Sequence, residues 1–569
     1  MSVPYTEKPW AFLNDYRGKA FSGEWPALPE MFRITVSRYP QRPCFTVYEP
    51  DRVSLNYTEA LRRVEALARW LHSKGIRKGD RLAVTGKNSP EWAVAYLGIL
   101  FAGAIVVPID YQLKTEEIDL LIKTAEAKIL FVDEEKHDRY AQSPGGLTAV
   151  LSLTKGVGTY IYDLDGPEAD IEQAAETDIA AILFTSGTMG HPKGVVLTHR
   201  NIVSDCYLAQ GTPLLIYHTD VFYAILPLHH SYTMLAVFIE TIGVGAEVVF
   251  GKRMVTTQML KEMKEGNVTM LLGVPMLFNK VLTGILRGIK EKGPIVYGLI
   301  SFLMGISGLI KKVFRINPGK KMFGFILKKA SLKSNRICIC GGGPLAPSVF
   351  KKYNQLGIDF VQGYGLTETS PIITINPIEH YKETSVGRPC PRVDMKILNP
   401  DERGVGEVIV KGPMVMKGYY NMPTETTEAF TADGYLKTGD LGYMDSENYL
   451  YLTGRGKNMI VTEGGKNVYP EEIENEFQLF EEIEQILIRA FVHDKKTKSE
   501  TIEALVFPNQ EFKGENGNVL SKEQMKDRVD KIILEVNQRL HPYQRIERTT
   551  ILDTPLEMTT TKKIKRTQL

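Results

Sequence analysis

The feature that most constrains the fold is an alternation of short apolar runs with helix-like segments through the first 370 residues. An apolar run over 81–85 is followed by helix-like residues 90–103. Further apolar runs occur at 105–108, 128–132, 247–250 and 270–274. Alternation of this kind is typical of sheets covered by helices. The sequence therefore predicts an α/β protein built from layered sheets and helices.

The pattern changes near residue 385. Turns that contain Gly, Pro or Asp now separate short strand-like runs over 394–398, 406–411 and 449–452. Closely spaced turn residues of these types favour short strands joined by tight connections. We therefore predict a small β-rich, β-barrel-like subdomain over 385–454.

A candidate domain boundary follows this β-rich region. Gly454 and Gly456 bracket a charged residue at the end of the last run, and Pro470 then begins a helix with acidic residues in its first turn. Proline and acidic side chains are favoured at helix N-termini. A chain of 569 residues is long enough for two or more domains. We predict a large N-terminal domain over 1–454 and a small α+β C-terminal domain over 455–569.

The composition is ordinary for a soluble globular protein, with a formal net charge of +2. The five cysteines are scattered without the paired spacing of a metal site, and Cys338 and Cys340 lie in an apolar run that predicts a buried strand. Residues 1–10 lack the basic and apolar regions of a signal peptide. We expect a cytoplasmic protein of a reducing compartment, without a nucleic-acid partner.

The segment 185–194 has the composition of a phosphate-binding loop. Glycines let backbone N–H groups approach a phosphate, hydroxyls donate hydrogen bonds to it, and a lysine adds positive charge. The candidate nucleotide-binding residues are Thr185, Ser186, Gly187, Thr188, Gly190 and Lys193. Their order is not that of a Walker loop. A Gly-rich hairpin between two strands is the alternative, because a second strand-like run begins at Val195.

A second glycine-containing segment, 363–368, carries an aromatic ring, a hydroxyl and a carboxylate. The ring of Tyr364 is suited to stacking on a purine. Thr367 is suited to hydrogen-bond a phosphate or carboxylate, and Glu368 is a candidate Mg²⁺ ligand because this cation prefers oxygen. A glycine turn with an exposed glutamate is the alternative for this segment taken alone. The glycines that accompany these side chains are Gly363 and Gly365.

Asp440 ends the segment 437–440, directly after a glycine. A carboxylate in this position is suited to accept hydrogen bonds from two ribose hydroxyls. Arg455 follows some fifteen residues later and is a candidate to join the same site. Glycine–aspartate pairs are also common in turns, which is the alternative interpretation.

Five motifs together resemble a known family. The sequences TSGTMGHPKG, GYGLTE, KTGD, GRGKNMI and the terminal TKKIKR have the order and spacing of the adenylate-forming superfamily, and the chain is most similar to its long-chain fatty acid–CoA ligases from residue 30 to 566. The resemblance implies that a carboxylate attacks the α-phosphate of ATP with the help of Mg²⁺, giving an acyl-adenylate and pyrophosphate. The thiol of CoA then displaces AMP. The alternatives are transfer to an acyl-carrier protein and, in a different class, a nucleotide-binding sensor without turnover.

The resemblance implies that Lys563 is the adenylation lysine. The family pattern near the C-terminus is a glycine and a lysine followed by an apolar and then a basic residue, and Ile564 and Arg566 set the register here. Lys562 stands where the glycine is usual, which leaves it as a second candidate. A frayed basic tail is the alternative.

The remaining implied roles concern the nucleotide, the metal and CoA. Thr185 and Glu368 would act with Lys563 in adenylation, and Thr188 with Glu368 would hold Mg²⁺. The C-terminal domain would be mobile and rotate about Lys457 between the two steps. Ribose contacts would come from Asp440 and Arg455, adenine contacts from Gly341, Gly342 and Gly343, and contacts with the pantetheine of CoA from Gly464 and Gly465.

Two features bear on the acid substrate. His229 and His230 match the motif beside the acyl carboxylate, where a ring can form a wall of the pocket; a buried structural histidine is the alternative for each. The segment 287–329 resembles an insertion typical of long-chain members. We therefore favour a long-chain fatty acid over acetate, an aryl acid or an amino acid.

The segment 287–329 is also strongly basic. It contains ten Lys and Arg residues and a single Glu, which gives a net charge of +9. The centre of the segment, 295–310, is uncharged and mostly apolar, and its sixteen residues fall short of the ~20 that cross a bilayer. A helix that lies on an anionic membrane surface fits this pattern. The alternative is a core helix under a basic rim.

Overall fold

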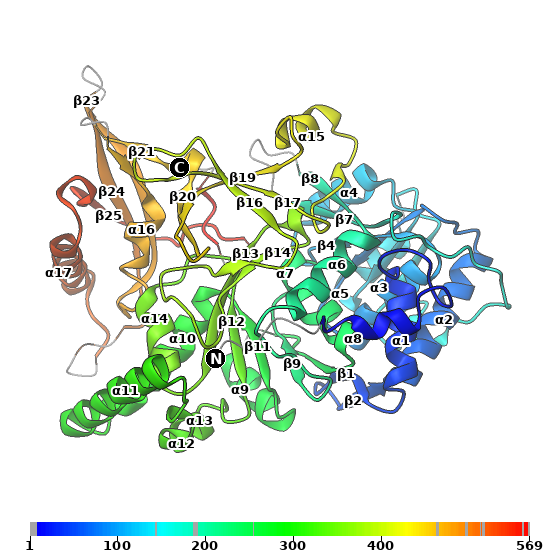
Figure 1. Cartoon of the computed structure of the whole chain (residues 1–569), viewed down its shortest axis with the longest axis horizontal. Coiled ribbons are helices and arrows are strands. Elements are labelled where there is room, and N and C mark those ends of the chain that lie inside the picture. The colour runs from blue at the N-terminus through cyan, green and yellow to red at the C-terminus, as the bar shows by residue number, and fades with distance from the viewer. Residues whose placement is uncertain are drawn as a thin grey trace.

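The computed structural model describes residues 8–142, 145–185, 192–253, 255–462, 466–494, 499–512, 514, 518–559 and 563–566. Two large sheets and their helices form the first part of the chain, a small antiparallel sheet follows, and the C-terminal residues form a further sheet with its own helices (Figure 1). The predicted α/β class, with a large N-terminal and a smaller C-terminal domain, is confirmed.

The first large sheet has seven strands. Its central strands are parallel and almost entirely buried, which explains why they read as continuous apolar runs. One edge is antiparallel, because two of its strands form a hairpin. The strand order is β18 (Gly418–Tyr419), β8 (Lys193–Thr198), β7 (Ile179–Thr185), β4 (Ile105–Ile109), β3 (Arg81–Thr85), β5 (Ile129–Val132) and β6 (Ala149–Ser152).

The second large sheet has nine strands, with a parallel centre and antiparallel edges. Strand β12, which carries Cys338 and Cys340, is buried throughout and both thiols are free, as the sequence predicted. The strand order is β15 (Arg388–Pro389), β14 (Ile372–Ile375), β13 (Asp359–Gly365), β12 (Ile337–Cys340), β11 (Met270–Gly273), β9 (Val221–Ala224), β10 (Glu247–Phe250), β1 (Pro43–Val47) and β2 (Val53–Asn56).

Helix α3 (Pro90–Phe101) lies between the two sheets, in contact with β3 and β4 of one and β1 of the other. All its residues except Glu91 are buried, which is why its sequence is apolar all round. Ser89 caps its start by accepting a hydrogen bond from the Trp92 N–H at 3.1 Å. Helix α2 (Tyr57–Ser73) packs beside it.

The other helical elements of the large part connect strands or cover the outer faces of the sheets (Figure 1). They are η1 (Ala11–Asp15), α1 (Leu28–Arg38), α4 (Thr115–Ala125), α5 (Glu134–Gln142), η2 (Ile161–Asp163), α6 (His199–Gln210), α7 (Ser231–Thr233), the π-helix η3 (Met234–Ile239), α8 (Glu240–Val244), α9 (Thr256–Glu265), α10 (Pro275–Lys290), α11 (Pro294–Phe314), α12 (Gly319–Met322), α13 (Gly324–Lys329), α14 (Pro347–Gln355) and η4 (Thr367–Thr369).

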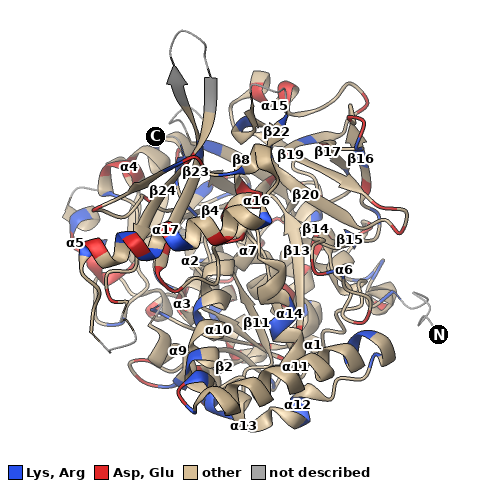
Figure 2. Cartoon of the chain, turned by 90° about the vertical axis from the view of Figure 1, so that its left-hand side faces the viewer, with Lys and Arg blue, Asp and Glu red and all other residues tan. Residues whose placement is uncertain are grey.

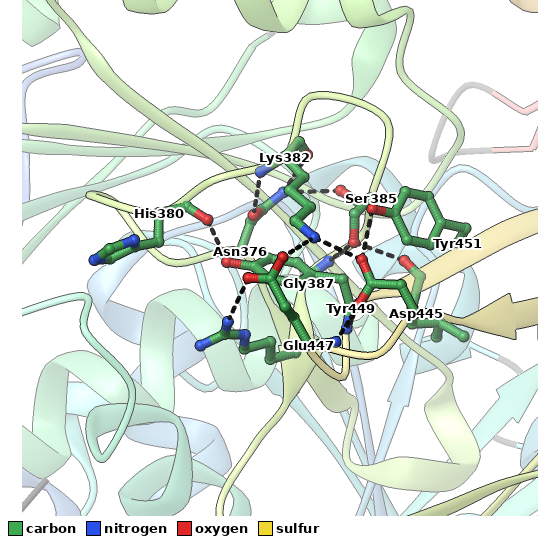
Figure 3. Close-up of polar contacts among 11 residues, drawn as sticks. Asn376, His380, Lys382, Ser385, Gly387, Asp445, Glu447, Tyr449 and Tyr451 are labelled. Carbon is green, nitrogen blue, oxygen red and sulfur yellow. Dashed lines mark hydrogen bonds and ion pairs between the residues drawn. The ribbon is translucent and has the colours of Figure 1, made fainter. Parts of the chain in front are cut away.

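The β-rich region forms a four-stranded antiparallel sheet, tied to the nine-stranded sheet by a polar cluster around Lys382 (Figure 3). The Lys382 ammonium lies 2.6 Å from Asp445 Oδ2 and 2.9 Å from Glu447 Oε1, both in the turn after β19. Asn376 donates to the carbonyls of Lys382 and Ser385. The elements are β16 (Asp394–Leu398), β17 (Gly406–Lys411), α15 (Pro423–Ala429), β19 (Leu436–Met444) and β20 (Leu450–Arg455).

The C-terminal domain has its own hydrophobic cluster, whose buried members begin at Ile460, whereas those of the large part end at Leu450. These separate cores support the proposed boundary near 455. Its elements are η5 (Gly456–Asn458), β21 (Ile460–Val461), β22 (Asn467–Val468), α16 (Pro470–Asn475), β23 (Ile483–Asp494), β24 (Ser499–Pro508), α17 (Lys522–Arg539), η6 (Pro542–Gln544) and β25 (Arg548–Ile551).

The apolar centre of the basic segment differs from the prediction. Helix α11 has 21 residues, because it continues through Lys311 and Lys312, so it is longer than the sixteen uncharged residues indicated. Among the described residues it is the one helix long and apolar enough to cross a membrane. Only 17% of its 18-residue apolar window is buried, which makes the core-helix interpretation wrong.

Candidate active site

A cleft of about 4180 Å³ brings together predicted site residues from distant parts of the chain. The residues that line it include Thr185, Lys193, His229, His230, Gly341, Gly342, Gly343, Gly363, Tyr364, Gly365, Thr367, Glu368, Asp440, Arg455, Lys457 and Lys563. Six further predicted residues lie outside the described part of the chain: Ser186, Gly187, Thr188, Gly190, Gly464 and Gly465.

The predicted phosphate loop joins two antiparallel strands at the edge of the cleft. Thr185, the last residue of β7, pairs with Lys193, the first of β8. The Thr185 hydroxyl donates to the Lys193 carbonyl at 3.4 Å, and the Lys193 ammonium lies 4.9 Å from the centre of the Tyr419 ring. The hairpin alternative is therefore correct for the flanking strands. It does not exclude a phosphate site, because both strand ends line the cleft.

The end of β13 carries Tyr364 into the cleft. A Cβ atom on Gly365 would lie 1.5 Å from the Pro371 carbonyl oxygen, so this position requires glycine. The Tyr364 hydroxyl donates to Asp440 Oδ2 at 2.7 Å. Burial raises the pKa of Tyr364 well above its usual range, so the hydroxyl keeps its proton. Tyr364 therefore helps to position the aspartate, and its stacking on a purine stays a prediction.

Glu368 lies in the short turn η4, at the edge of the cleft. Its Oε1 accepts a hydrogen bond from the Tyr419 hydroxyl at 3.0 Å. The neighbouring Thr367 hydroxyl is 3.0 Å from that of Ser231. Among the described residues, no group of three or more His, Cys, Asp or Glu is placed to hold a metal ion. Mg²⁺ is usually bound by one or two carboxylates together with phosphate and water oxygens, and Glu368 fits that pattern.

Asp440 and Arg455 face each other across β19 and β20. The two residues are register partners, and Arg455 Nε lies 2.8 Å from Asp440 Oδ1. The charge of Asp440 raises the pKa of Arg455. Because Tyr364 binds the other carboxylate oxygen, the orientation of Asp440 is fixed on both sides. The carboxylate is buried except where it meets the cleft.

Lys563 is presented to the cleft by an ordered segment. The Thr559 N–H donates to the Lys563 carbonyl at 2.7 Å, and the Lys565 N–H donates to the Glu557 carbonyl at 2.8 Å. Arg566 then forms two hydrogen bonds with the Glu474 carboxylate, at 2.7 and 2.6 Å. The frayed-tail alternative is therefore wrong for residues 563–566.

The pKa of Lys563 depends on its burial in the cleft and on the charged groups near it. Desolvation within the cleft and the charge of Arg455 lower the pKa of Lys563, while Asp440 opposes the shift. Lys563 in turn lowers the pKa of His230, after the larger effect of burial. The residue as a whole is nevertheless exposed. Lys563 thus interacts electrostatically with the Asp440–Arg455 pair and with His230.

The two histidines are mostly buried and neutral. Burial lowers the pKa of His229 and of His230 to about 3. His230 Nδ1 accepts the Tyr232 N–H at 3.3 Å and so caps α7. The structural interpretation holds for His230. The residue also lines the cleft, and its role as a wall beside the acyl carboxylate stays a prediction. The residues that line the cleft also include apolar ones: Ala209, Ile216, Phe222, Ala236, Leu272 and Ile372.

Other residues that shape the cleft carried no sequence signal. Gln478, in the C-terminal domain, donates to the Pro344 carbonyl at 3.0 Å and accepts the Ala346 N–H at 2.8 Å, next to the predicted adenine segment. Tyr419 holds Glu368 from a strand with no recognisable motif. Both contacts depend on tertiary structure. Lys457 lies in η5, where desolvation and the charges of Arg455 and Arg566 lower its pKa.

Comparisons with known proteins agree with this arrangement. The chain matches a family model described as AMP-binding enzyme over residues 32–420. A feruloyl-CoA synthase from Amycolatopsis sp. is 30% identical over 465 residues, 80% of this chain and 82% of that protein. A long-chain-fatty-acid–CoA ligase from Bacillus subtilis (strain 168) is 28% identical over 548 residues, 88% and 89% of the two chains. ATP-bound MatB from Rhodopseudomonas palustris, 25% identical, has a TM-score of 0.74 and covers 95% of this chain and 97% of its own.

Proposed function

The chain belongs to the AMP-binding enzyme family, and on that premise we propose that it is an AMP-forming acyl-CoA ligase for a long-chain fatty acid. The observation that carries the proposal is the position of Lys563 in one cleft with the Asp440–Arg455 pair and His230. A cation between a nucleotide side and an acyl side is what the attack of a carboxylate on a phosphate requires.

In the first step the acid carboxylate attacks the α-phosphate of ATP, and pyrophosphate leaves. Asp440 would accept hydrogen bonds from the ribose hydroxyls, with its carboxylate held by Arg455 and Tyr364. Lys563 would offset the charge on the two anions as they approach, and Thr185 would hydrogen-bond a phosphate oxygen. Gly341, Gly342 and Gly343 would lie along the adenine.

A magnesium site fits the same region. Glu368 would hold the ion together with Thr188 and phosphate oxygens, and Tyr419 orients the glutamate by donating to one of its oxygens. When bound, Mg²⁺ would neutralise part of the charge on the transferring phosphate. The other Glu368 oxygen is the one proposed to face the ion.

In the second step the CoA thiol attacks the acyl carbonyl, and AMP leaves. Lys563 would have to withdraw to make room, which a rotation of the C-terminal domain about Lys457 would accomplish. Gly464 and Gly465 would then lie near the pantetheine. Transfer to an acyl-carrier protein instead of CoA is the second candidate, since it uses the same first step.

A long-chain acid is favoured by the apolar residues among those that line the cleft and by the similarity to a long-chain-fatty-acid–CoA ligase. Two neutral histidines add no charge that would bind a second carboxylate. The similarity to a feruloyl-CoA synthase makes an aromatic acid the competitor to test.

The test is AMP release from ATP with acetate, octanoate, palmitate and ferulate, each with and without CoA. We expect the highest kcat/KM with palmitate and accumulation of a thioester only with CoA. Preference for ferulate would overturn the assignment of the acid. AMP release with little thioester at any chain length would favour the carrier-protein acceptor, and no acid-dependent AMP release would favour a sensor.

A further inference from the structure

Helix α11 is held to the molecule by one face only. Met304, Ser307 and Lys311, spaced by three and four residues, are its buried positions. The helix contacts α10, α12 and α14. The Lys311 ammonium lies 2.6 Å from Asp359 Oδ1 and 2.7 Å from Asn354 Oδ1. This buried ion pair fixes the helix against the surface of the large part.

The opposite face of α11 is apolar and exposed. Side chains three and four residues apart lie on one side of a helix, and this spacing joins six apolar residues into a continuous stripe. Ile295 is 85% exposed, Phe302 67% and Leu309 63%. The stripe consists of Ile295, Leu299, Phe302, Ile306, Leu309 and Val313. Phe325 of α13, 68% exposed, adds to the same region.

This concentration is unusual for a molecule of this kind. Eleven of the twenty-one strongly exposed large apolar residues among those described fall within 295–325. Extended apolar patches on soluble proteins mark surfaces that bind a partner or a membrane. The stripe therefore requires a partner with an apolar surface. The charge around the stripe indicates which kind of partner fits.

Basic side chains surround the stripe. In Figure 2 the lysines and arginines of α11, α12 and α13 lie along the lower edge of the molecule, beside the uncharged outer face of α11. The exposed basic residues are Arg287, Lys290, Lys292, Lys312, Arg315, Lys321, Lys328 and Lys329. The single acid of the segment is Glu291. An anionic partner is favoured over a second copy of this chain, because the +9 segments of two copies would repel each other.

We propose that α11, α12 and α13 form a membrane-docking surface, with α11 lying along an anionic lipid bilayer. The apolar stripe enters the boundary between headgroups and acyl chains, and the flanking lysines contact anionic headgroups. The helix lies on the membrane and does not cross it, because Lys311 is buried and paired on its inner side. This proposal goes beyond the proposed function, since membrane binding requires no turnover.

The docking surface adjoins the cleft. Arg287 and Lys290 of α10, the helix that precedes α11, line the cleft. An acid that leaves the bilayer at α11 would therefore meet the part of the cleft that these two residues line. This consequence rests on the proposed function, whereas docking itself does not.

The experiment is co-sedimentation of the full-length protein with vesicles of phosphatidylcholine alone or with added phosphatidylglycerol. We expect binding to the anionic vesicles that weakens as salt increases. A variant carrying Phe302→Ser and Leu309→Ser should lose binding by at least about tenfold. Leu534→Ser, at an exposed apolar position of α17, is the matched control and should bind normally.

A second variant tests the charge separately. Lys321→Glu with Lys328→Glu should weaken binding to anionic vesicles and leave binding to phosphatidylcholine unchanged. Thermal unfolding and activity on octanoate should stay at the wild-type level in both variants, which shows that they fold. No binding by the wild type, or equal binding by the Phe302 and Leu309 variant, would overturn the proposal. A dimer detected by light scattering and lost in that variant would assign the stripe to self-association.

Discussion

Lys563 is held at the cleft by a neighbouring ion pair. Arg566, three residues further along the chain, forms two hydrogen bonds with Glu474. The buried side of this ion pair also includes the Ile488 carbonyl, which accepts from Arg566 at 3.0 Å. Burial raises the pKa of Glu474 to about 7, and the charge of Arg566 opposes that shift. The position of the lysine therefore depends on a contact far from the reacting atoms.

Replacing Lys563 separates the two half-reactions. Lys563→Ala should slow acyl-adenylate formation by at least about 10²-fold, the usual cost of losing one charge-stabilising group. Thioester formation from supplied acyl-adenylate should be largely retained, because the lysine has to leave for that step. Lys565→Ala, on the same segment, is the control and should affect neither rate strongly. Equal loss of both half-reactions in Lys563→Ala would contradict the assigned role.

Glu240 makes stability depend on pH. It is buried at the start of α8 and lines the cleft, and burial raises its pKa to about 8. The neutral form is favoured in the folded state, so its stabilising effect is complete below the unfolded pKa near 4.5 and is lost as pH rises through about 8. Glu240→Gln stays neutral. We expect its melting temperature to exceed that of the wild type by an increasing margin between pH 6 and 9.

The matched control for this comparison is Glu265→Gln, at an exposed position of α9. This substitution removes an exposed carboxylate and keeps the buried Glu240. The melting temperature of the variant should therefore follow that of the wild type across the same pH range. A constant difference between Glu240→Gln and wild type from pH 6 to 9 would contradict a buried group that titrates in this range. Each unit of pKa shift corresponds to about 1.4 kcal/mol, so the effect is measurable.

At the scale of the element, the end of β13 allows no side chain at Gly365. A Cβ atom would overlap the Pro371 carbonyl oxygen, so Gly365→Ala must displace either β13 or the turn after η4. We expect ATP–pyrophosphate exchange to fall steeply and the melting temperature to drop. Gly288→Ala is the control: it lies in α10 with open space around it, and alanine there should stabilise the helix by up to about 1 kcal/mol.

Elements whose pattern is local were predictable, and those that depend on tertiary packing were less so. The strands 81–85, 394–398 and 406–411 have the bounds that their apolar patterns indicated. The length of α11 was underestimated, because Lys311 was counted as the end of an apolar run. The helix continues through Lys311, whose charge is paired with Asp359 of β13. The pairing of Asp440 with Arg455 required knowledge of the β19–β20 register.

At the scale of the whole molecule, Gln478 connects the C-terminal domain to the large part. Its side-chain amide contacts both Pro344 and Ala346, and Asn279 donates to it at 3.3 Å. These contacts hold the domain where Lys563 faces the cleft. No sequence motif indicated them, because each forms between segments more than a hundred residues apart.

Gln478→Ala should therefore weaken the arrangement that serves adenylation. Each lost hydrogen bond contributes about 0.5–1.5 kcal/mol, so the loss of all three should slow acyl-adenylate formation by at least about tenfold. Thioester formation from supplied acyl-adenylate should not slow. Gln538→Ala, exposed on α17, is the control. A Gln478 variant with an unchanged adenylation rate would show that other contacts set the domain position.

The attachment of Lys563 through Arg566 has a consequence for biosynthesis. Domains generally fold as units, the N-terminal one first, while the ribosome is still adding residues. The two large sheets use strands that are complete by residue 419, about 140 residues before Lys563 is added. A nascent chain can therefore form both large sheets well before it contains Lys563, the proposed adenylation lysine. Unfinished or C-terminally clipped molecules would bind ATP without consuming it.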